Sequence, residues 1–130
     1  MPKKILLVED EEYSYDLLRD RLRNKDYDVE LATTGEQAVA SAEADVPDLI
    51  LMDIRLPGQN GYETTRAVRR LDGGRGADVP IIALTAHALE EDREKAITAG
   101  CDDYHAKPVH FSKLLEQMET LLEGPLSTRA

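Results

Sequence analysis

Short apolar runs and longer amphipathic stretches alternate along the chain. The apolar runs cover residues 4–8, 29–32, 49–52, 80–84 and, more weakly, 103–106. The runs at 4–8, 49–52 and 80–84 are nearly continuous in Ile, Leu and Val. Such continuity is typical of strands that are buried on both faces of a parallel sheet. The pattern therefore predicts five strands.

The stretches between these runs have the spacing of amphipathic helices. In the last stretch, an apolar stripe from Phe111 to Leu122 predicts a helix that ends at Gly124-Pro125. Two further helices are predicted at about residues 61–71 and 89–99, and Gly100 follows the second as a C-cap. After the first strand, one helix face is predicted to carry Tyr13, Leu17, Leu18 and Leu22.

One more helix is expected after the second strand. It begins with the residues Thr34-Gly-Glu-Gln37, which have the pattern of a capping box. Five strand–helix units in a row predict an α/β fold with a parallel sheet and helices on both faces. The strand order 2-1-3-4-5, the flavodoxin-like arrangement, is the expected solution for five units. We expect one domain over residues 1–124 and a short tail at 125–130.

Composition narrows the classes of partner. The chain has 130 residues and a net charge of -10, which disfavours electrostatic binding to nucleic acid or to an anionic membrane. No apolar run approaches the roughly 20 residues that a membrane helix needs, and the first residues lack a secretory signal. The single cysteine, Cys101, cannot form an internal disulfide, so we expect a cytoplasmic protein.

Polar residues whose side chains can bind ligands or take part in reactions follow the predicted strands. Glu9 and Asp10 follow the first strand, Asp53 the third, Thr85 the fourth and Lys107 the fifth. In the order 2-1-3-4-5 these four strands are neighbours, so their carboxyl ends meet at one edge of the sheet. Ligands of open α/β sheets bind at this edge.

The charges at this edge suggest a metal and a phosphoryl group. Glu9, Asp10 and Asp53 face one lysine, Lys107, and a hard cation such as Mg²⁺ would relieve their mutual repulsion. A metal would also attract a phosphoryl group and neutralise charge during its transfer. Asp53 can act as the nucleophile of such a transfer, while Lys107 and Thr85 can contact phosphoryl oxygens.

The chain resembles the receiver domains of two-component response regulators. Four stretches, in order and each at a strand end, carry this resemblance: ILLVEDEE, PDLILMDIRLPGQNGYE, PIIALTAHA and AGCDDYHAKPV. They span nearly the whole chain, from Lys4 to about Leu122.

The resemblance assigns a role to each residue of the predicted site. It implies that Asp53 accepts a phosphoryl group in the presence of Mg²⁺, with Mn²⁺ as an alternative. It makes Asp10 a direct metal ligand, places Glu9 in the same pocket through water, and adds the backbone carbonyl of Arg55. Lys107 would pair with the phosphoryl group.

The resemblance also implies a conformational switch. Thr85 and Tyr104 would move when the phosphoryl group arrives and change the surface formed by the fourth helix, the fifth strand and the fifth helix. A downstream protein target would bind this surface. Arg55 and His87 occupy positions that tune the lifetime of the phosphorylated state, and Pro108 is expected to follow a cis peptide bond.

These roles predict a signalling protein that is not an enzyme in the usual sense. Its phosphoryl donor would be a histidine kinase or a histidine phosphotransfer protein. We expect a stand-alone regulator, with a phosphorelay intermediate and a receiver excised from a hybrid histidine kinase as alternatives. A Mg²⁺-dependent phosphatase with an Asp nucleophile is the alternative from another class, but such an enzyme would have D-x-D after the first strand, where this chain has Glu9, Asp10 and Glu11.

Overall fold

The computed structural model describes residues 2–86 and 90–123. Strands and helices alternate along this part of the chain, as the sequence predicts. A single-turn 3₁₀ helix, η1, lies between α3 and β4. The elements are β1 (Lys4–Val8), α1 (Glu12–Asn24), β2 (Asp28–Ala32), α2 (Gly35–Ala44), β3 (Leu49–Asp53), α3 (Gly61–Arg69), η1 (Asp72–Gly74), β4 (Ile81–Thr85), α4 (Glu90–Ala99), β5 (Asp103–Ala106) and α5 (Phe111–Glu123).

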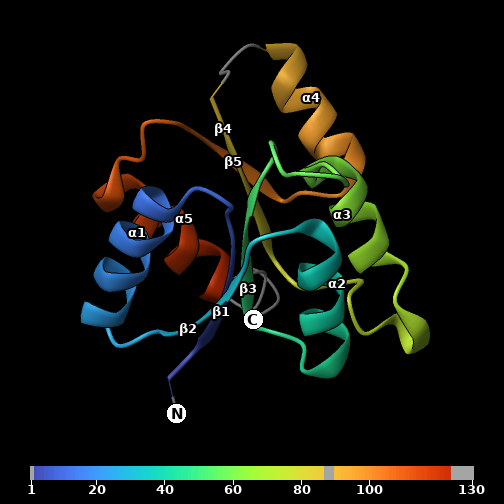
Figure 1. The fold of residues 1–130 in the computed structure, drawn as a ribbon, viewed down its shortest axis with the longest axis horizontal. Coiled ribbons are helices and arrows are strands. Elements are labelled where there is room, and N and C mark those ends of the chain that lie inside the picture. The colour runs from blue at the N-terminus through green and yellow to red at the C-terminus, as the bar shows by residue number, and fades with distance from the viewer. Residues whose placement is uncertain (1, 87–89, 124–130) are drawn as a thin grey trace.

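The five strands form one parallel sheet in the order β2-β1-β3-β4-β5. This confirms the predicted order. Figure 1 shows β3 and β4 side by side near the centre of the molecule. In the register, Asp53 is opposite Leu84, and Thr85 is opposite Ala106. The last residues of β3, β4 and β5 therefore lie at one edge of the sheet.

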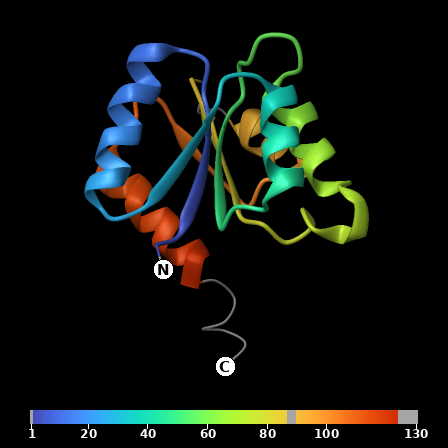
Figure 2. The same ribbon diagram turned by 60° about the horizontal axis from the view of Figure 1, so that its bottom comes forward.

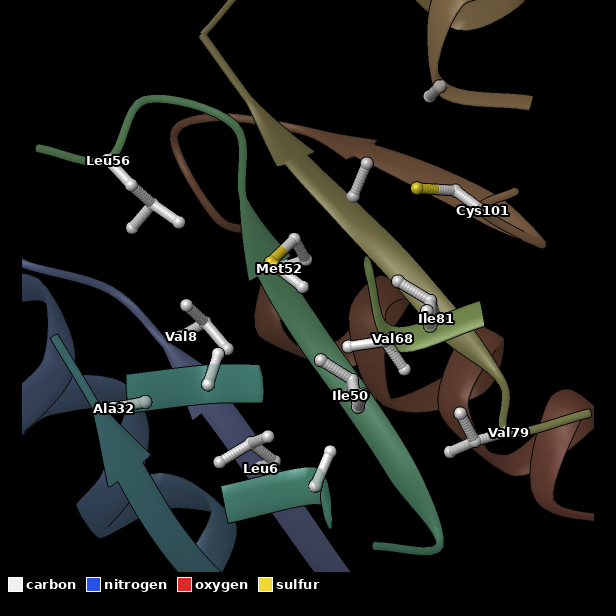
Figure 3. Close-up of a cluster of buried hydrophobic side chains, with 14 of the residues drawn as sticks. Leu6, Val8, Ala32, Ile50, Met52, Leu56, Val68, Val79, Ile81 and Cys101 are labelled. Atoms are coloured by element: carbon white, nitrogen blue, oxygen red, sulfur yellow. The ribbon is translucent and has the colours of Figure 1, made fainter. Parts of the chain in front are cut away.

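Helices cover both faces of the sheet, which confirms the predicted fold class. Figure 2 shows α1 and α5 on one side and α2, α3 and α4 on the other. Each side has its own hydrophobic cluster. Leu6 and Ile50 belong to the cluster under α2, α3 and α4, which Figure 3 shows, and their neighbours Ile5 and Leu49 belong to the other cluster. Successive residues of β1 and β3 thus fill opposite cores, which explains their continuous apolar runs.

The predicted apolar face of α1 is wrong in two positions. Leu18 and Leu22 are buried, and Tyr15 packs against the same cluster. Tyr13 and Leu17, however, are 75% and 44% exposed. The helix packs through residues spaced three and four apart from Leu18, and this contact face is rotated away from positions 13 and 17.

Helix caps differ from the prediction as well. The Thr34 hydroxyl accepts a hydrogen bond from the Gln37 backbone N–H (3.1 Å), but the side-chain Oε1 of Gln37 accepts from the Thr33 backbone N–H (2.8 Å) rather than from that of Thr34. A complete capping box begins α3 instead, where the side chains of Asn60 and Glu63 each accept from the other's backbone N–H. This cap fixes the first turn of α3 next to the carboxyl end of β3.

Gly61, the first residue of α3, lies directly against the end of β3. Its backbone N–H donates to the Ile54 carbonyl (2.9 Å), and a β-carbon at this position would overlap the Asp53 carbonyl oxygen. Only glycine permits this close approach. The residue therefore sets how near α3 comes to Asp53.

Several predictions fall outside the described residues. They are His87, the start of the fourth helix at residue 89, and the boundary between a domain at 1–124 and a tail at 125–130. The boundary stays a prediction. None of the described helices is both long and apolar enough to cross a lipid bilayer.

Candidate functional site

Four strand ends bring the predicted site residues together. Glu9 and Asp10 directly follow β1, Asp53 and Thr85 are the last residues of β3 and β4, and Lys107 directly follows β5. Glu9, Asp53 and Thr85 are buried, with exposed fractions of 2%, 4% and 6%, whereas Asp10 is exposed. The parallel topology therefore produces a pocket of acidic groups with one carboxylate at its rim.

The ammonium group of Lys107 spans two of these carboxylates. Its Nζ lies 3.0 Å from Oε1 of Glu9 and 3.3 Å from Oδ1 of Asp53. The backbone N–H of Lys107 donates to the Thr85 carbonyl (2.7 Å), so the lysine is also attached to the end of β4. The following bond, Lys107–Pro108, is cis. Lys107 thus lies where it can contact a group bound to Asp53.

Backbone amides hold the two buried carboxylates in place. Oε2 of Glu9 accepts from the backbone N–H groups of Asp10 (3.1 Å) and Glu11 (3.3 Å). Oδ1 of Asp53 accepts from the Arg55 N–H (3.2 Å). Both oxygens of Glu9 are therefore bonded within the protein, which leaves Asp10 and Asp53 with more capacity for an outside ligand.

Negative charge in the pocket exceeds what Lys107 compensates. Burial first and Glu9 second raise the pKa of the Asp53 carboxyl to about 7, although Lys107 and the Arg55 N–H act in the opposite direction. Burial alone would lower the pKa of the Lys107 ammonium, but the carboxylates of Glu9 and Asp53 outweigh burial and raise it. The site therefore favours the approach of a cation.

The donor set fits a hard divalent ion. One carboxylate oxygen from each of Glu9, Asp10 and Asp53 can be chosen so that all three lie within 4.8 Å of one another. Oxygen ligands are those that Mg²⁺ prefers, and it commonly binds through one or two carboxylates while keeping several waters. Burial and the neighbouring Glu9 raise the pKa of Asp53, which is a second sign that the pocket disfavours further negative charge.

A small cavity of about 170 Å³ opens beside Asp53. Three residues that the sequence did not reveal line it: Tyr62 of α3, and Asp92 and Lys95 of α4. Asp92 and Lys95 are three residues apart, so they share a helix face, and this spacing is the signal in the sequence that could have identified them. The lining as a whole consists of Asp53, Ile54, Arg55, Tyr62, Thr85, Ala86, Asp92, Lys95 and Lys107.

The predicted switch residues lie near this cavity. Thr85 lines it, and Arg55 lies at its exposed rim. Tyr104 is opposite Ala83 in the sheet and packs, half-buried, against the cluster under α2, α3 and α4. A tyrosine on this face lies on the same side of the sheet as α4, which carries Asp92 and Lys95.

The fold and the pocket define a receiver domain of the kind found in response regulators. A family model described as "Response regulator receiver domain" matches residues 5–119, and the chain belongs to this family. It is a family of two-component signalling proteins rather than of conventional enzymes.

Curated relatives include both isolated and embedded receivers. The chain is 36% identical over 122 residues to the polar-differentiation response regulator DivK of Brucella anthropi, covering 94% of this chain and 98% of DivK. It is also 36% identical over 125 residues to hybrid signal transduction histidine kinase I of Dictyostelium discoideum, where it spans 92% of this chain but only 7% of the kinase.

Solved structures agree on the fold. The receiver domain of the sensor histidine kinase PA1611 from Pseudomonas aeruginosa PAO1 is 43% identical, with a TM-score of 0.86 over 94% of this chain and 98% of that one. That crystal structure holds a magnesium ion coordinated in the active site cleft. A putative response regulator from Chloroflexus aurantiacus is 30% identical with a TM-score of 0.88, over 94% and 98% of the two chains.

Proposed function

We propose that the protein accepts a phosphoryl group on Asp53 from a phosphorylated histidine of another protein. The single observation that carries this proposal is the position of Asp53. It is buried, within ion-pair distance of Lys107, and close to two further carboxylates that can hold a metal. Membership of the receiver family and the magnesium-bound relative support the same role.

The transfer is a displacement at phosphorus. A carboxylate oxygen of Asp53 forms a bond to phosphorus while the bond from phosphorus to the donor imidazole nitrogen breaks. The nitrogen keeps the electron pair and takes up a proton. The Asp53 carboxyl must be ionised to attack, and Lys107 favours that form.

Each neighbour then has a defined task. Asp10 and Asp53 would hold Mg²⁺, or Mn²⁺, with Glu9 acting through water and the Arg55 carbonyl completing the set. A bound Mg²⁺ supplies positive charge to the phosphoryl oxygens during transfer. Lys107 would exchange its contact with Asp53 for a contact with a phosphoryl oxygen, since its Nζ already lies 3.3 Å from the carboxylate.

The phosphorylated carboxyl would act as a local switch. It adds negative charge and strong acceptor oxygens beside Thr85, whose hydroxyl would move to bind them. Tyr104 would then reposition on β5 and alter the surface of α4, β5 and α5 for a protein target. Arg55 and His87 would tune the lifetime of the phosphorylated state.

The partners proposed here are proteins. A histidine kinase or a histidine phosphotransfer protein supplies the phosphoryl group in a cytoplasmic setting, without direct contact to nucleic acid or insertion into a membrane. The expectation of a stand-alone regulator stays a prediction, since the relatives include both DivK and a hybrid kinase. The alternative of a phosphatase loses support because the chain belongs to the receiver family.

Incubation with a small acyl phosphate and Mg²⁺, followed by intact-mass measurement, tests the proposal. The wild type should gain one phosphoryl group, and Asp53→Asn should gain none. Asp78→Asn, an exposed carboxylate outside the site, is the matched control and should label like the wild type. Absence of label on the wild type, or persistent label on Asp53→Asn, would contradict the proposal.

A second measurement separates the relay from the terminal regulator. The phosphorylated protein is mixed with candidate histidine phosphotransfer proteins, and the label on each chain is followed over time. Rapid loss of label to the partner identifies a relay intermediate. Retention of the label identifies a regulator whose output is its changed surface.

A further inference from the structure

A buried histidine lies on β5, two residues before Lys107. His105 is 5% exposed and is opposite Leu84 in the sheet. Leu84 belongs to the hydrophobic cluster under α1 and α5. The imidazole therefore occupies a position on the core face of the strand, and a polar ring in such a position requires hydrogen-bond partners.

Both ring nitrogens have a partner. Nδ1 lies 2.7 Å from Oε1 of Gln117 on α5, and Nε2 accepts from the backbone N–H of His110 at 3.0 Å. A backbone N–H can only donate, so Nε2 carries no proton. The ring is therefore neutral, with its proton on Nδ1 and directed at Gln117.

The orientation of Gln117 agrees with this assignment. Its amide nitrogen donates to Oδ2 of Asp103 and to the backbone carbonyl of Tyr104, both at 2.9 Å. With its nitrogen committed to two acceptors, the amide must present its oxygen to the ring. The network thus has one consistent set of donors and acceptors, and in this set His105 is uncharged.

These bonds hold the segment that carries Lys107. At its start, the Lys107 N–H donates to the Thr85 carbonyl at 2.7 Å. At its end, the His110 N–H donates to His105, and the His110 carbonyl accepts from Leu114 in the first turn of α5 (2.9 Å). The bond to His105 thus attaches the far end of residues 107–110 to β5.

We infer that neutral His105 is a positioning residue, which holds the segment 107–110 so that Lys107 reaches the phosphoacceptor, and that protonation of His105 releases this segment. This inference rests on the proposed phosphoryl transfer to Asp53. A protonated Nε2 is a donor that faces the His110 N–H, so the bond between them is lost. Acidification would then weaken the hold of Lys107 on the phosphoryl site.

The charged and titratable groups that line the groove beside the ring come from β5, from α5 and from the segment between them. A groove of about 470 Å³ beside β5 is lined by His105 together with Asp103, His110 and Lys113. Asp103 is already bonded to Gln117 and to the Tyr104 N–H. A positive charge on His105 would share this groove with Lys113.

Three variants separate positioning from simple packing. His105→Gln keeps an oxygen acceptor for the His110 N–H that cannot be protonated near neutral pH. His105→Leu fills the space without an acceptor. His110→Gln removes the exposed neighbouring imidazole but keeps the backbone N–H, and is the matched control.

The measurement is the initial rate of labelling by an acyl phosphate with saturating Mg²⁺, between about pH 5 and pH 8, where histidine changes its charge. The ratio of the wild-type rate to the His105→Gln rate cancels the titration of Asp53 itself. This ratio should be near one at high pH and fall about tenfold at low pH, and His105→Leu should be about tenfold slower throughout. The control should follow the wild type.

A flat ratio across the range, or wild-type rates for His105→Leu, would overturn the inference while leaving the proposed function intact. Failure of the wild type to label at any pH would instead overturn the proposed function.

In that case, nuclear magnetic resonance can still test the hydrogen bond between His105 and the His110 N–H. Ring ¹⁵N shifts should show the Nδ1–H form at high pH, and exchange of the His110 amide hydrogen should accelerate on acidification. A proton on Nε2 or an unprotected amide at high pH would contradict the inference.

Discussion

The amino edge of the sheet, where the parallel strands begin, and the carboxyl edge, where they end, use similar charged residues in opposite ways. At the amino edge, the Lys4 ammonium lies 2.8 Å from Asp45 and 2.9 Å from Glu30, while its backbone N–H donates to Asp48 at 2.7 Å. The bond to Asp45 is the largest cause of the raised pKa of Lys4. Lys4 is half-buried but both carboxylates of its ion pairs are well exposed to water, so each pair contributes about 0–1 kcal/mol to stability.

A second cation at the amino edge is more deeply engaged. The Arg69 guanidinium donates to the carbonyls of Gly76, Val79 and Gly100 at 2.6–3.1 Å and forms an ion pair with Asp102 at 3.1 Å. It thereby ties the end of α3 to the chain before β4 and to the end of α4. Every charge in this group has a partner, and its role is to hold elements together.

At the carboxyl edge, by contrast, two of the carboxylates are buried, with Glu9 2% and Asp53 4% exposed. Glu9 and Asp53 share the single ammonium of Lys107, and Asp10 adds a third carboxylate. The raised pKa of Asp53 shows that the folded protein disfavours its charged form. The carboxylates at the amino edge stay in contact with water, whereas the buried negative charge at the carboxyl edge costs stability and is available to a cation or a phosphoryl group.

Loss of the Arg69 network should have the largest effect. Arg69→Ala removes the guanidinium donor from three carbonyls and breaks the ion pair with Asp102, so we expect a loss of about 3 kcal/mol in the free energy of unfolding. Unfolding by denaturant measures this change in the free energy of unfolding. Arg66→Ala, an exposed arginine of the same helix, should change stability little, and equal losses for both variants would remove the contrast between the edges.

Removal of Lys107 should affect chemistry more than folding. Lys107→Met keeps the length of the side chain but deletes the charge next to Asp53, and we expect labelling by an acyl phosphate to slow about a hundredfold. Lys3→Met, an exposed lysine before β1, is the control. An unchanged labelling rate in Lys107→Met would show that the ammonium is only a structural partner of Glu9.

The excess charge at the carboxyl edge predicts a stabilising substitution. Folding raises the pKa of Asp53 from 3.8 to about 7, so the stability linked to its bound proton is full below about pH 4 and is lost as the pH rises through 7. Without metal, Asp53→Asn should therefore raise the free energy of unfolding by about 2 kcal/mol at pH 8 and by much less at pH 5.

Thermal unfolding in a chelating buffer, at both pH values, checks this prediction. Added Mg²⁺ should stabilise the wild type and narrow its difference from Asp53→Asn, because a ligand of the folded state alone adds stability. A variant that is less stable than the wild type at pH 8 would show that Lys107 compensates the pocket fully.

The smallest effect is expected at Lys4. Lys4→Met deletes two ion pairs whose carboxylates are exposed, and it should lower the free energy of unfolding by about 0.5 kcal/mol. The loss should shrink further in high salt, which screens exposed charges, and unfolding at two salt concentrations measures it. A loss as large as that of Arg69→Ala would show that the exposed pairs of this edge are not weak.

The sequence predicted what depends on chain topology. Continuous apolar runs identified the strands, and the parallel order then brought Glu9, Asp10, Asp53, Thr85 and Lys107 to one edge. The same reasoning could not reveal which side of a helix makes contact. Tyr13 and Leu17 satisfy the apolar spacing yet lie in solvent, because packing selects one of several similar faces.

Contacts between elements far apart in the sequence were also missed. Tyr62 and Lys95 reach the cavity only through the placement of α3 and α4. The partners of His105 depend on a side chain of α5 twelve residues away. A histidine within a weak strand has no local signal that shows whether it is exposed or bonded on both nitrogens.

The hydrogen bonds around Tyr104 also affect whether other protein chains can associate with the sheet in a concentrated solution. β5 is an edge strand, and there the Tyr104 N–H and carbonyl are bonded to Asp103 and Gln117. Unpaired backbone groups at an edge are a template for strand addition by another chain, and natural proteins avoid this by covering or charging the edge. The other outer strand of the sheet, β2, carries Asp28 and Glu30. Both borders of the sheet are thus protected against aggregation.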